Sequence, residues 1–204
     1  MAKVHPESNS SSPPLSMAGV LRREILTVWM KSLVMNGNGC TVYDSGGRIV
    51  YRVDNYDYKC SEEVYLMDHC GKTLTKIVRK KLRVFGRWEG YRHSDGPTKG
   101  RKPWFRVGKA CRILKGGNPY EHSVTATGCG SSDPTSYKIV SSGHKSEYKI
   151  KDMAGGLIAE VKRKHTASGV ALGDDVLTLM MEPNVDHLLM MGLVIVCGLI
   201  NNSM

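Results

Sequence analysis

The residues that could do acid–base, metal or phosphate chemistry are scattered along this 204-residue chain. Its seven histidines form no HExxH pair and no His/Cys cluster at metal-ligand spacing. Gly71-Lys72-Thr73 has the form of the end of a phosphate-binding loop, but the glycine required five residues earlier is Leu66. No GxSxG turn presents a serine nucleophile. We therefore expect no catalytic residue, no metal site, no cofactor and no enzymatic activity.

Positive charge is concentrated in one segment, Lys72 to Lys115. It contains fifteen Lys or Arg residues and two acids, so it carries +13, while the rest of the chain carries −3. Such an excess attracts polyanions, for example nucleic acid, an anionic membrane or phosphoinositide headgroups. A solvated strand face is the alternative interpretation, because lysines are common on outward strand faces.

Within this segment, a continuous strand would divide the cations between two faces by its period of two. One face would carry Arg79 and Arg87, and the other would carry Lys80 and Trp88. We expect the first face to lie outside the fold, with contributions from basic residues elsewhere. The candidate anion-binding residues are Arg79, Lys81, Arg83, Arg87, Arg101, Lys102, Lys162 and Lys164.

The elements that must position these residues form one domain. Residues 1–18 are rich in Ser and Pro and cannot bury enough apolar area to fold, so we expect a flexible leader. The remainder, 19–204, is long enough for one core, and the whole chain is 41% hydrophobic and 24% charged, as in globular proteins. We expect it to be a monomer.

Runs of β-branched and aromatic residues broken by Gly, Asn and Asp predict a mainly β fold. The predicted strands are Ile25 to Leu33, Thr73 to Arg87, Trp104 to Leu114, Ser136 to Ser141, Glu147 to Asp152, Leu157 to Lys164 and Val176 to Met181. Asn36-Gly37-Asn38-Gly39 predicts a turn after the first run.

One turn pattern occurs three times, at Asp44, Asp68 and Asp152. Each Asp is followed by Gly three residues later and by apolar residues six and nine residues later. The Asp side chain can bond the turn backbone and the Gly can adopt a left-handed conformation. The pattern predicts a repeated hairpin of strand, tight turn and returning strand; three independent Asp-Gly turns are the alternative.

The C-terminal segment is different, because Leu188 to Ile200 is apolar without interruption. Pro183-Asn184 predicts a break followed by an N-cap, with Asp186 in the first turn of a helix at 185–200. A helix that is apolar all round must be buried in protein or lipid. Its apolar run spans only about 20 Å, short of a hydrocarbon core of roughly 30 Å. We expect a core helix and no transmembrane span, with a tail-anchored membrane protein as the alternative.

The six cysteines form no CxxC pair and follow no secretory signal. We expect reduced thiols in the cytoplasm, with the nucleus or a membrane surface as further locations.

Several motifs resemble the plant LURP-one-related proteins. They are Thr27-Val28-Trp29-Met30-Lys31-Ser32-Leu33, Asn36 to Asp44, Tyr51 to Tyr56, Leu66-Met67-Asp68, Arg79 to Leu82, Gly86-Arg87-Trp88-Glu89-Gly90, Ala159 to Lys164, Leu172 to Val176, and Glu182 to Asp186 with the apolar tail. The resemblance runs from about Val20 to the C-terminus.

The resemblance implies a tubby-like fold, a closed antiparallel β-barrel around a hydrophobic C-terminal helix, as in phospholipid scramblases. It also implies a role in plant defence. We expect a non-enzymatic binding or adaptor module that recognises anionic lipid, such as a phosphoinositide, or an acidic protein. A nucleic-acid-binding or membrane-tethered transcription-related protein is the alternative.

Overall fold

The computed structural model describes residues 22–31, 38–55, 62–81, 86–93, 101–109, 121–127, 134–141 and 146–201. The strands are β1 (Glu24–Trp29), β2 (Asn38–Tyr43), β3 (Ile49–Asn55), β4 (Glu63–Asp68), β5 (Thr73–Lys80), β6 (Arg87–Arg92), β7 (Phe105–Lys109), β8 (Glu121–Thr127), β9 (Pro134–Ser141), β10 (Tyr148–Asp152), β11 (Leu157–Arg163) and β12 (Val176–Met181). One helix follows them, α1 (His187–Ile200).

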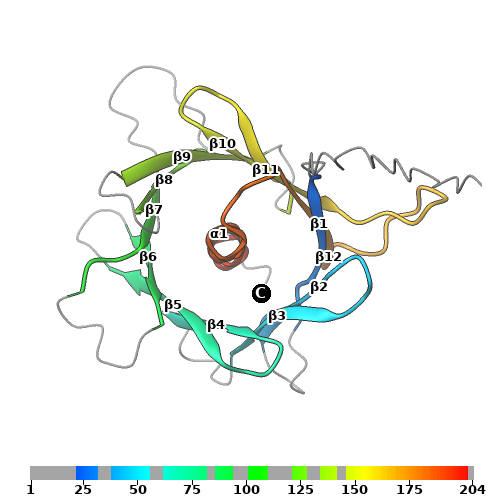
Figure 1. The fold of residues 1–204 in the computed structure, drawn as a ribbon, viewed down its shortest axis with the longest axis horizontal. Helices are drawn as coiled ribbons and strands as arrows, with labels where there is room; N and C mark the ends of the chain where they lie inside the picture. The colour runs from blue at the N-terminus through cyan, green and yellow to red at the C-terminus, as the bar shows by residue number, and fades with distance from the viewer. Residues whose placement is uncertain are drawn as a thin grey trace, which may run out of the picture.

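The twelve strands form a closed antiparallel barrel, as predicted (Figure 1). Each strand pairs with its neighbours in the sequence, and the pairing of β1 with β12 closes the ring. Closure pairs both sides of every strand, so no open sheet edge invites another chain to add. The predicted leader and the predicted turn at Asn36-Gly37 lie outside the described residues; Asn38 and Gly39 belong to β2 and not to that turn.

The three Asp-Gly hairpins are confirmed and share the same detailed geometry. Gly47, Gly71 and Gly155 have φ values of 76°, 85° and 93°, and each amide donates to the carbonyl of the Asp three residues earlier. The three Asp side chains accept from turn amides, for example Oδ1 of Asp44 from the amides of Gly46 and Arg48. The pairing register shifts beside each turn, so the three hairpins are copies of one structure.

The predicted strand Thr73 to Arg87 is wrong as a single element. β5 ends at Lys80 and β6 begins at Arg87, and the two pair as an antiparallel hairpin. The three Asp-Gly turns begin at an Asp with a Gly three residues later, whereas this basic run has no Gly before Gly86. The absence of that signal explains why sequence patterning missed the reversal.

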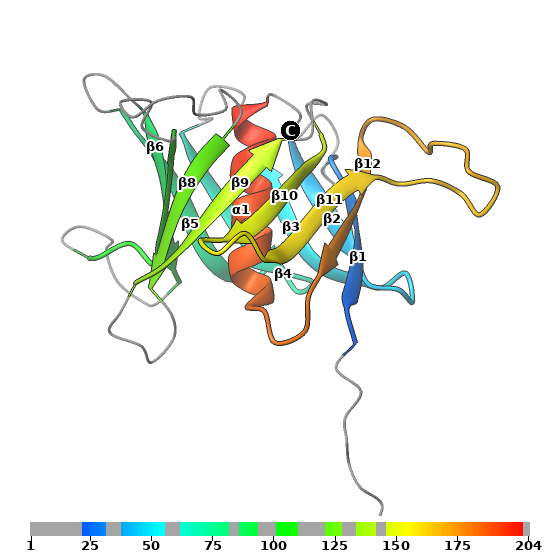
Figure 2. The same ribbon diagram turned by 90° about the horizontal axis from the view of Figure 1, so that it is seen from above.

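The helix α1 runs through the middle of the barrel, as predicted (Figures 1 and 2). Leu189 to Gly198 are buried, so the apolar surface of the helix is covered by the barrel wall. The predicted cap was displaced by two residues. Asp186 is the N-cap and its Oδ1 accepts from the amide of Leu189 at 3.0 Å, while Asn184 adopts a left-handed φ of 63° in the preceding turn.

The helix contacts the β6–β7 wall through Gly192 and through its N-cap, Asp186. Phe105 is fully buried, and a Cβ on Gly90 or Gly192 would lie 2.1 Å or 2.8 Å from its ring, so only glycine permits this approach. At the N-terminal end of the helix, Nη2 of Arg92 lies 2.8 Å from Oδ2 of Asp186. The Arg92 guanidinium also stacks 4.2 Å from the Trp104 ring centroid. Because α1 occupies the middle of the barrel, we look for the candidate binding residues on the outer wall.

Candidate anion-binding face

The basic residues predicted around β5 and β6 do not share one face. Cross-strand register places Arg79 opposite Trp88 and Lys80 opposite Arg87. Arg79 follows the alternation of the buried Ile77, and its guanidinium lies 5.9 Å from the Trp88 ring centroid. The prediction that Arg79 and Arg87 lie on one face is wrong, because the chain reverses between them. Arg83 lies outside the described residues.

Acids compensate much of the charge in this region. Lys81 pairs with Glu62. On the next strand Glu89 has a side chain only 4% exposed, with Arg87 at 2.8 Å and Arg106 at 3.4 Å. Burial opposes ionisation of Glu89, but a hydrogen bond from Tyr91 and the two guanidinium groups outweigh it and lower its pKa. Arg87 and Arg106 therefore pair with the buried Glu89 carboxylate while remaining partly exposed to solvent.

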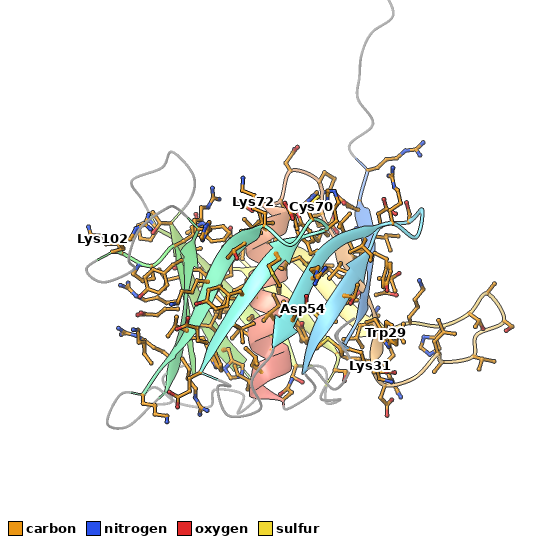
Figure 3. All side chains as sticks on the ribbon, turned by 90° about the horizontal axis from the view of Figure 1, so that it is seen from below. Trp29, Lys31, Asp54, Cys70, Lys72 and Lys102 are labelled. Atoms are coloured by element: carbon orange, nitrogen blue, oxygen red, sulfur yellow. The ribbon has the colours of Figure 1, made fainter. Side chains whose placement is uncertain are left out.

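The remaining predicted residues lie elsewhere on the barrel. Arg101 and Lys102 precede β7, at the end of the barrel opposite the β5–β6 reversal; Lys102 lies at the same end as Cys70 and Lys72 (Figure 3). Lys162 and Lys164 belong to β11 and its extension, which five strand positions separate from β6 around the ring. The seven predicted residues that the structure describes therefore do not form one patch.

A second group of cations lies on the outer wall of β9, β10 and β11. Lys149 and Lys151 alternate with the buried Tyr148 and Ile150, so they point outward. On the next strand Lys162 follows the buried Val161. We name the set Lys138, Lys149, Lys151, Lys162 and Lys164 the lysine face.

The register places two of these lysines directly against each other. Lys138 of β9 lies opposite Lys151 of β10, an arrangement that destabilises a sheet when no anion is near. Lys138 has a distant carboxylate partner, Glu121, at 3.6 Å. Lys151 has no carboxylate partner among the described residues. A bound anion between β9 and β10 would relieve this repulsion.

Glu160 lies at the centre of the lysine face. Its side chain is 7% exposed, and its two oxygens lie 3.3 Å from Lys149 and 2.9 Å from Lys162. Burial opposes ionisation, but hydrogen bonds from both lysines dominate and lower the pKa of the carboxyl. Glu160 therefore orients two ammonium groups while leaving them partly exposed, at 43% and 60% of their side-chain area.

A shallow hollow of about 280 Å³ adjoins Glu160 on the outer wall. Ile25 of β1 pairs with Met180 of β12, which pairs with Glu160, so the three strands bring these side chains into one row. The lining residues are Ile25, Glu160, Lys162, Arg163, His165, Thr178 and Met180. The lining therefore combines apolar side chains with cationic ones.

Exposed apolar side chains lie at both ends of β11 and on β1. Among the described residues six large apolar side chains are exposed, and four of them are Ile25, Met153, Val170 and Leu172. Met153 lies in the turn before β11, and Val170 and Leu172 lie in the hairpin arm after it, residues 164–175. This arm projects from the barrel between β11 and β12 (Figure 2).

The buried thiols Cys40 and Cys197 belong to β2 and α1, away from the lysine face. Burial raises the pKa of both thiols to about 12, which favours their protonated form. The described part of the chain holds no group of three or more His, Cys, Asp or Glu side chains able to bind a metal ion. The arrangement at β9–β11, where Glu160 orients Lys149 and Lys162, is suited to binding anions.

Sequence patterning included Lys162 and Lys164 but missed the other members of the lysine face. A signal for Lys149 and Lys151 was present, since they alternate with apolar residues just before the third Asp-Gly turn. If Asp152 begins a hairpin, the same alternation places Lys149 and Lys151 before the turn, and Lys162 and Lys164 after it, on the outer face. The position of Lys138 opposite Lys151 depends on the β9–β10 register, which no local pattern specifies.

A closed antiparallel barrel around a central helix defines a class of β-barrel proteins. The chain belongs to the LURP-one-related family, whose match covers residues 24–198. It is 43% identical over 211 residues to protein LURP-one-related 11 of Arabidopsis thaliana, covering 98% of this chain and 89% of that protein. Protein LURP-one-related 3 of the same plant is 48% identical over 177 residues, covering 85% and 77%.

A solved X-ray structure supports the fold independently. A protein from Arabidopsis thaliana superimposes with a TM-score of 0.60 at 14% identity, covering 89% of this chain and 93% of that one. At this identity the likeness concerns the fold alone. Within the described residues no helix is long and apolar enough to cross a membrane.

Proposed function

We propose that this protein is a non-enzymatic binding module that docks onto anionic phospholipid headgroups through the lysine face. The observation that carries the proposal is the coincidence, around β11, of five outward lysines with exposed aliphatic side chains. A role in plant defence signalling, which the family resemblance implies, is part of the proposal.

The balance of charge supports an anionic ligand. Glu160 is shared between Lys149 and Lys162, and the Lys138–Lys151 pair has only the distant Glu121. Each lysine close to an anionic membrane contributes about 1 kcal/mol of attraction. Five lysines against Glu121 and Glu160 leave a net charge of about +3, which would contribute about 3 kcal/mol of attraction to such a membrane.

The neighbouring apolar side chains favour lipid over the two competing polyanions. Lysine stems and aliphatic side chains suit the boundary between headgroups and acyl chains. Single-stranded nucleic acid is usually bound by stacking on aromatic rings, and the hollow beside Glu160 is lined by no Phe, Tyr or Trp ring. An acidic protein would satisfy the charges but would leave the outward Val170 and Leu172 unexplained.

Vesicle sedimentation tests the proposal. Wild-type protein is mixed with neutral phosphatidylcholine vesicles, or with vesicles that also contain phosphatidylserine or a phosphoinositide. We expect pelleting with the anionic vesicles alone, weakening as salt is raised because exposed charges are screened. The Lys151→Glu/Lys164→Glu variant should lose at least about tenfold in apparent affinity.

The matched control is Arg101→Glu/Lys102→Glu, which makes the same change in net charge at an exposed site away from the lysine face. It should pellet nearly as well as wild type. If both variants lost vesicle affinity equally, the loss would follow from the change in net charge alone, which would contradict the proposed site. Retention on acidic peptide or DNA, with no vesicle binding, would replace lipid by that ligand.

A further inference from the structure

We infer that the arm of residues 164–175 is a membrane-insertion element that carries Val170 and Leu172 into the headgroup–acyl boundary when the lysine face docks. The inference rests on the proposed function and adds which part of the chain penetrates the bilayer.

The arm is held by its own hydrogen bonds. The Leu172 amide donates to the Lys164 carbonyl at 2.9 Å, and the Thr166 amide donates to the Val170 carbonyl at 2.8 Å. At the tip, the Gly169 amide donates to the Thr166 carbonyl at 2.9 Å, and the Val170 amide donates to Oγ1 of Thr166 at 3.1 Å. The arm is thus a preformed hairpin extension of β11 and β12.

This hairpin gains little from tertiary packing. Every residue from 165 to 172 is exposed, and Val170 and Leu172 are 63% and 50% exposed. A two-stranded hairpin without a packed face is marginally stable in water, since ordering its backbone costs free energy that burial does not offset. An ordered arm with outward aliphatic side chains gains that burial from an external apolar phase.

The distribution of charge along the arm indicates that this apolar phase is an anionic membrane. Residues 165–172 contain no carboxylate, and the base carries Arg163 and Lys164 next to the lysine face. The two acids at the base are already paired: Asp174 lies 3.0 Å from Arg163, and Asp175 lies 3.0 Å from Lys31. The tip, Thr166 to Gly169, is uncharged, Val170 lies next to it, and Leu172 lies opposite Lys164 at the cationic base. Uncharged and aliphatic side chains beyond a cationic base suit an anionic membrane surface, with acyl chains below charged headgroups.

The test uses the full chain and phosphatidylcholine vesicles with and without phosphatidylserine. Val170→Ser/Leu172→Ser removes the apolar surface at unchanged net charge and should weaken binding to anionic vesicles at least about tenfold. Val170→Leu/Leu172→Val keeps the arm apolar and should bind like wild type. Because these side chains are exposed, all variants should unfold at the wild-type temperature.

A Val170→Trp variant reports insertion directly. Its emission should shift to the blue on anionic vesicles and be quenched by bromine-labelled acyl chains, beyond the change in wild-type protein from Trp29, Trp88 and Trp104. If Val170→Ser/Leu172→Ser binds anionic vesicles as tightly as wild type, or if Val170→Trp shows no more quenching than wild type, the arm inference is overturned. The proposed function would still stand. Absence of wild-type binding to anionic vesicles would overturn both.

Discussion

Cations at the β5–β6 reversal and on the β9–β11 wall differ in what surrounds them. In the first region Lys81 faces Glu62, Arg79 stacks on Trp88, and Arg87 shares the buried Glu89 with Arg106. In the second, lysines from three strands lie on one face, two of them directly opposite each other. Charge density along the chain is therefore a poor guide to charge density on the surface of a barrel.

Both regions exist only while the barrel stays folded around α1. A charge at Val194 or Leu189, which are 1% and 4% exposed, would be buried without a partner. We expect Val194→Asp or Leu189→Asp to cost more than about 4 kcal/mol and to unfold the whole domain, removing both regions together. Circular dichroism and thermal unfolding measure this. Ile200→Asp, at the exposed end of the helix, should remain folded, and a folded Val194→Asp protein would contradict the buried-helix account.

Glu89 should matter to stability and not to membrane binding. Glu89→Gln removes the negative charge between Arg87 and Arg106, and we expect a loss of about 1–2 kcal/mol in the free energy of unfolding. The folded-state pKa of Glu89 is lowered, so its contribution is complete above the unfolded value of about 4.3 and is lost as pH falls through the folded value. Denaturant unfolding between pH 7 and pH 3 should therefore show a gap between wild type and variant that narrows in acid. A gap that widens in acid would contradict this role.

Glu160 provides the matching test on the other wall. Glu160→Gln removes the acid that Lys149 and Lys162 share, and should cost about 1 kcal/mol of stability because both lysines remain partly solvated. It should also strengthen binding to anionic vesicles, about severalfold. Glu89→Gln should leave that binding unchanged. If Glu89→Gln strengthened vesicle binding and Glu160→Gln did not, the β5–β6 region and not the β9–β11 wall would be the membrane-binding surface.

The smallest expected effect on stability has an informative sign. Lys151→Glu turns the like-charge pair with Lys138 into an ion pair, worth about 0.2–1 kcal/mol, so the protein should become slightly more stable while its vesicle affinity falls. Thermal unfolding and sedimentation of the same preparation measure the two quantities. Lys151→Ala should lower affinity less and gain less stability. A destabilised Lys151→Glu protein would show that Lys151 supports the fold.

Local patterns predicted much of the wall. The Asp-Gly turns at Asp44, Asp68 and Asp152 and the apolar run after Leu188 were sufficient for three hairpins and a buried helix, because each signal lies within a few residues. The family resemblance supplied the closure of the barrel. The reversal between Lys80 and Arg87 was missed, since no Asp-Gly signal marks it.

The candidate face required information that no local pattern contains. Which lysines meet is decided by register between strands far apart in the sequence, as with Lys138 and Lys151, and by which strands adjoin around the ring. The density of basic residues along the sequence therefore points to Lys72 to Lys115 instead. The lysine face lies in the part of the chain whose summed charge is −3.

We propose that the β9–β11 wall, and not the β5–β6 region, binds the anionic surface. The most direct measurement is sedimentation with phosphatidylserine-containing vesicles of two variants that change net charge equally, Lys151→Glu/Lys164→Glu and Arg79→Glu/Lys80→Glu. The account predicts at least about tenfold weaker binding for the first and at most about twofold for the second. Equal binding by both variants, or a larger loss for Arg79→Glu/Lys80→Glu, would contradict it.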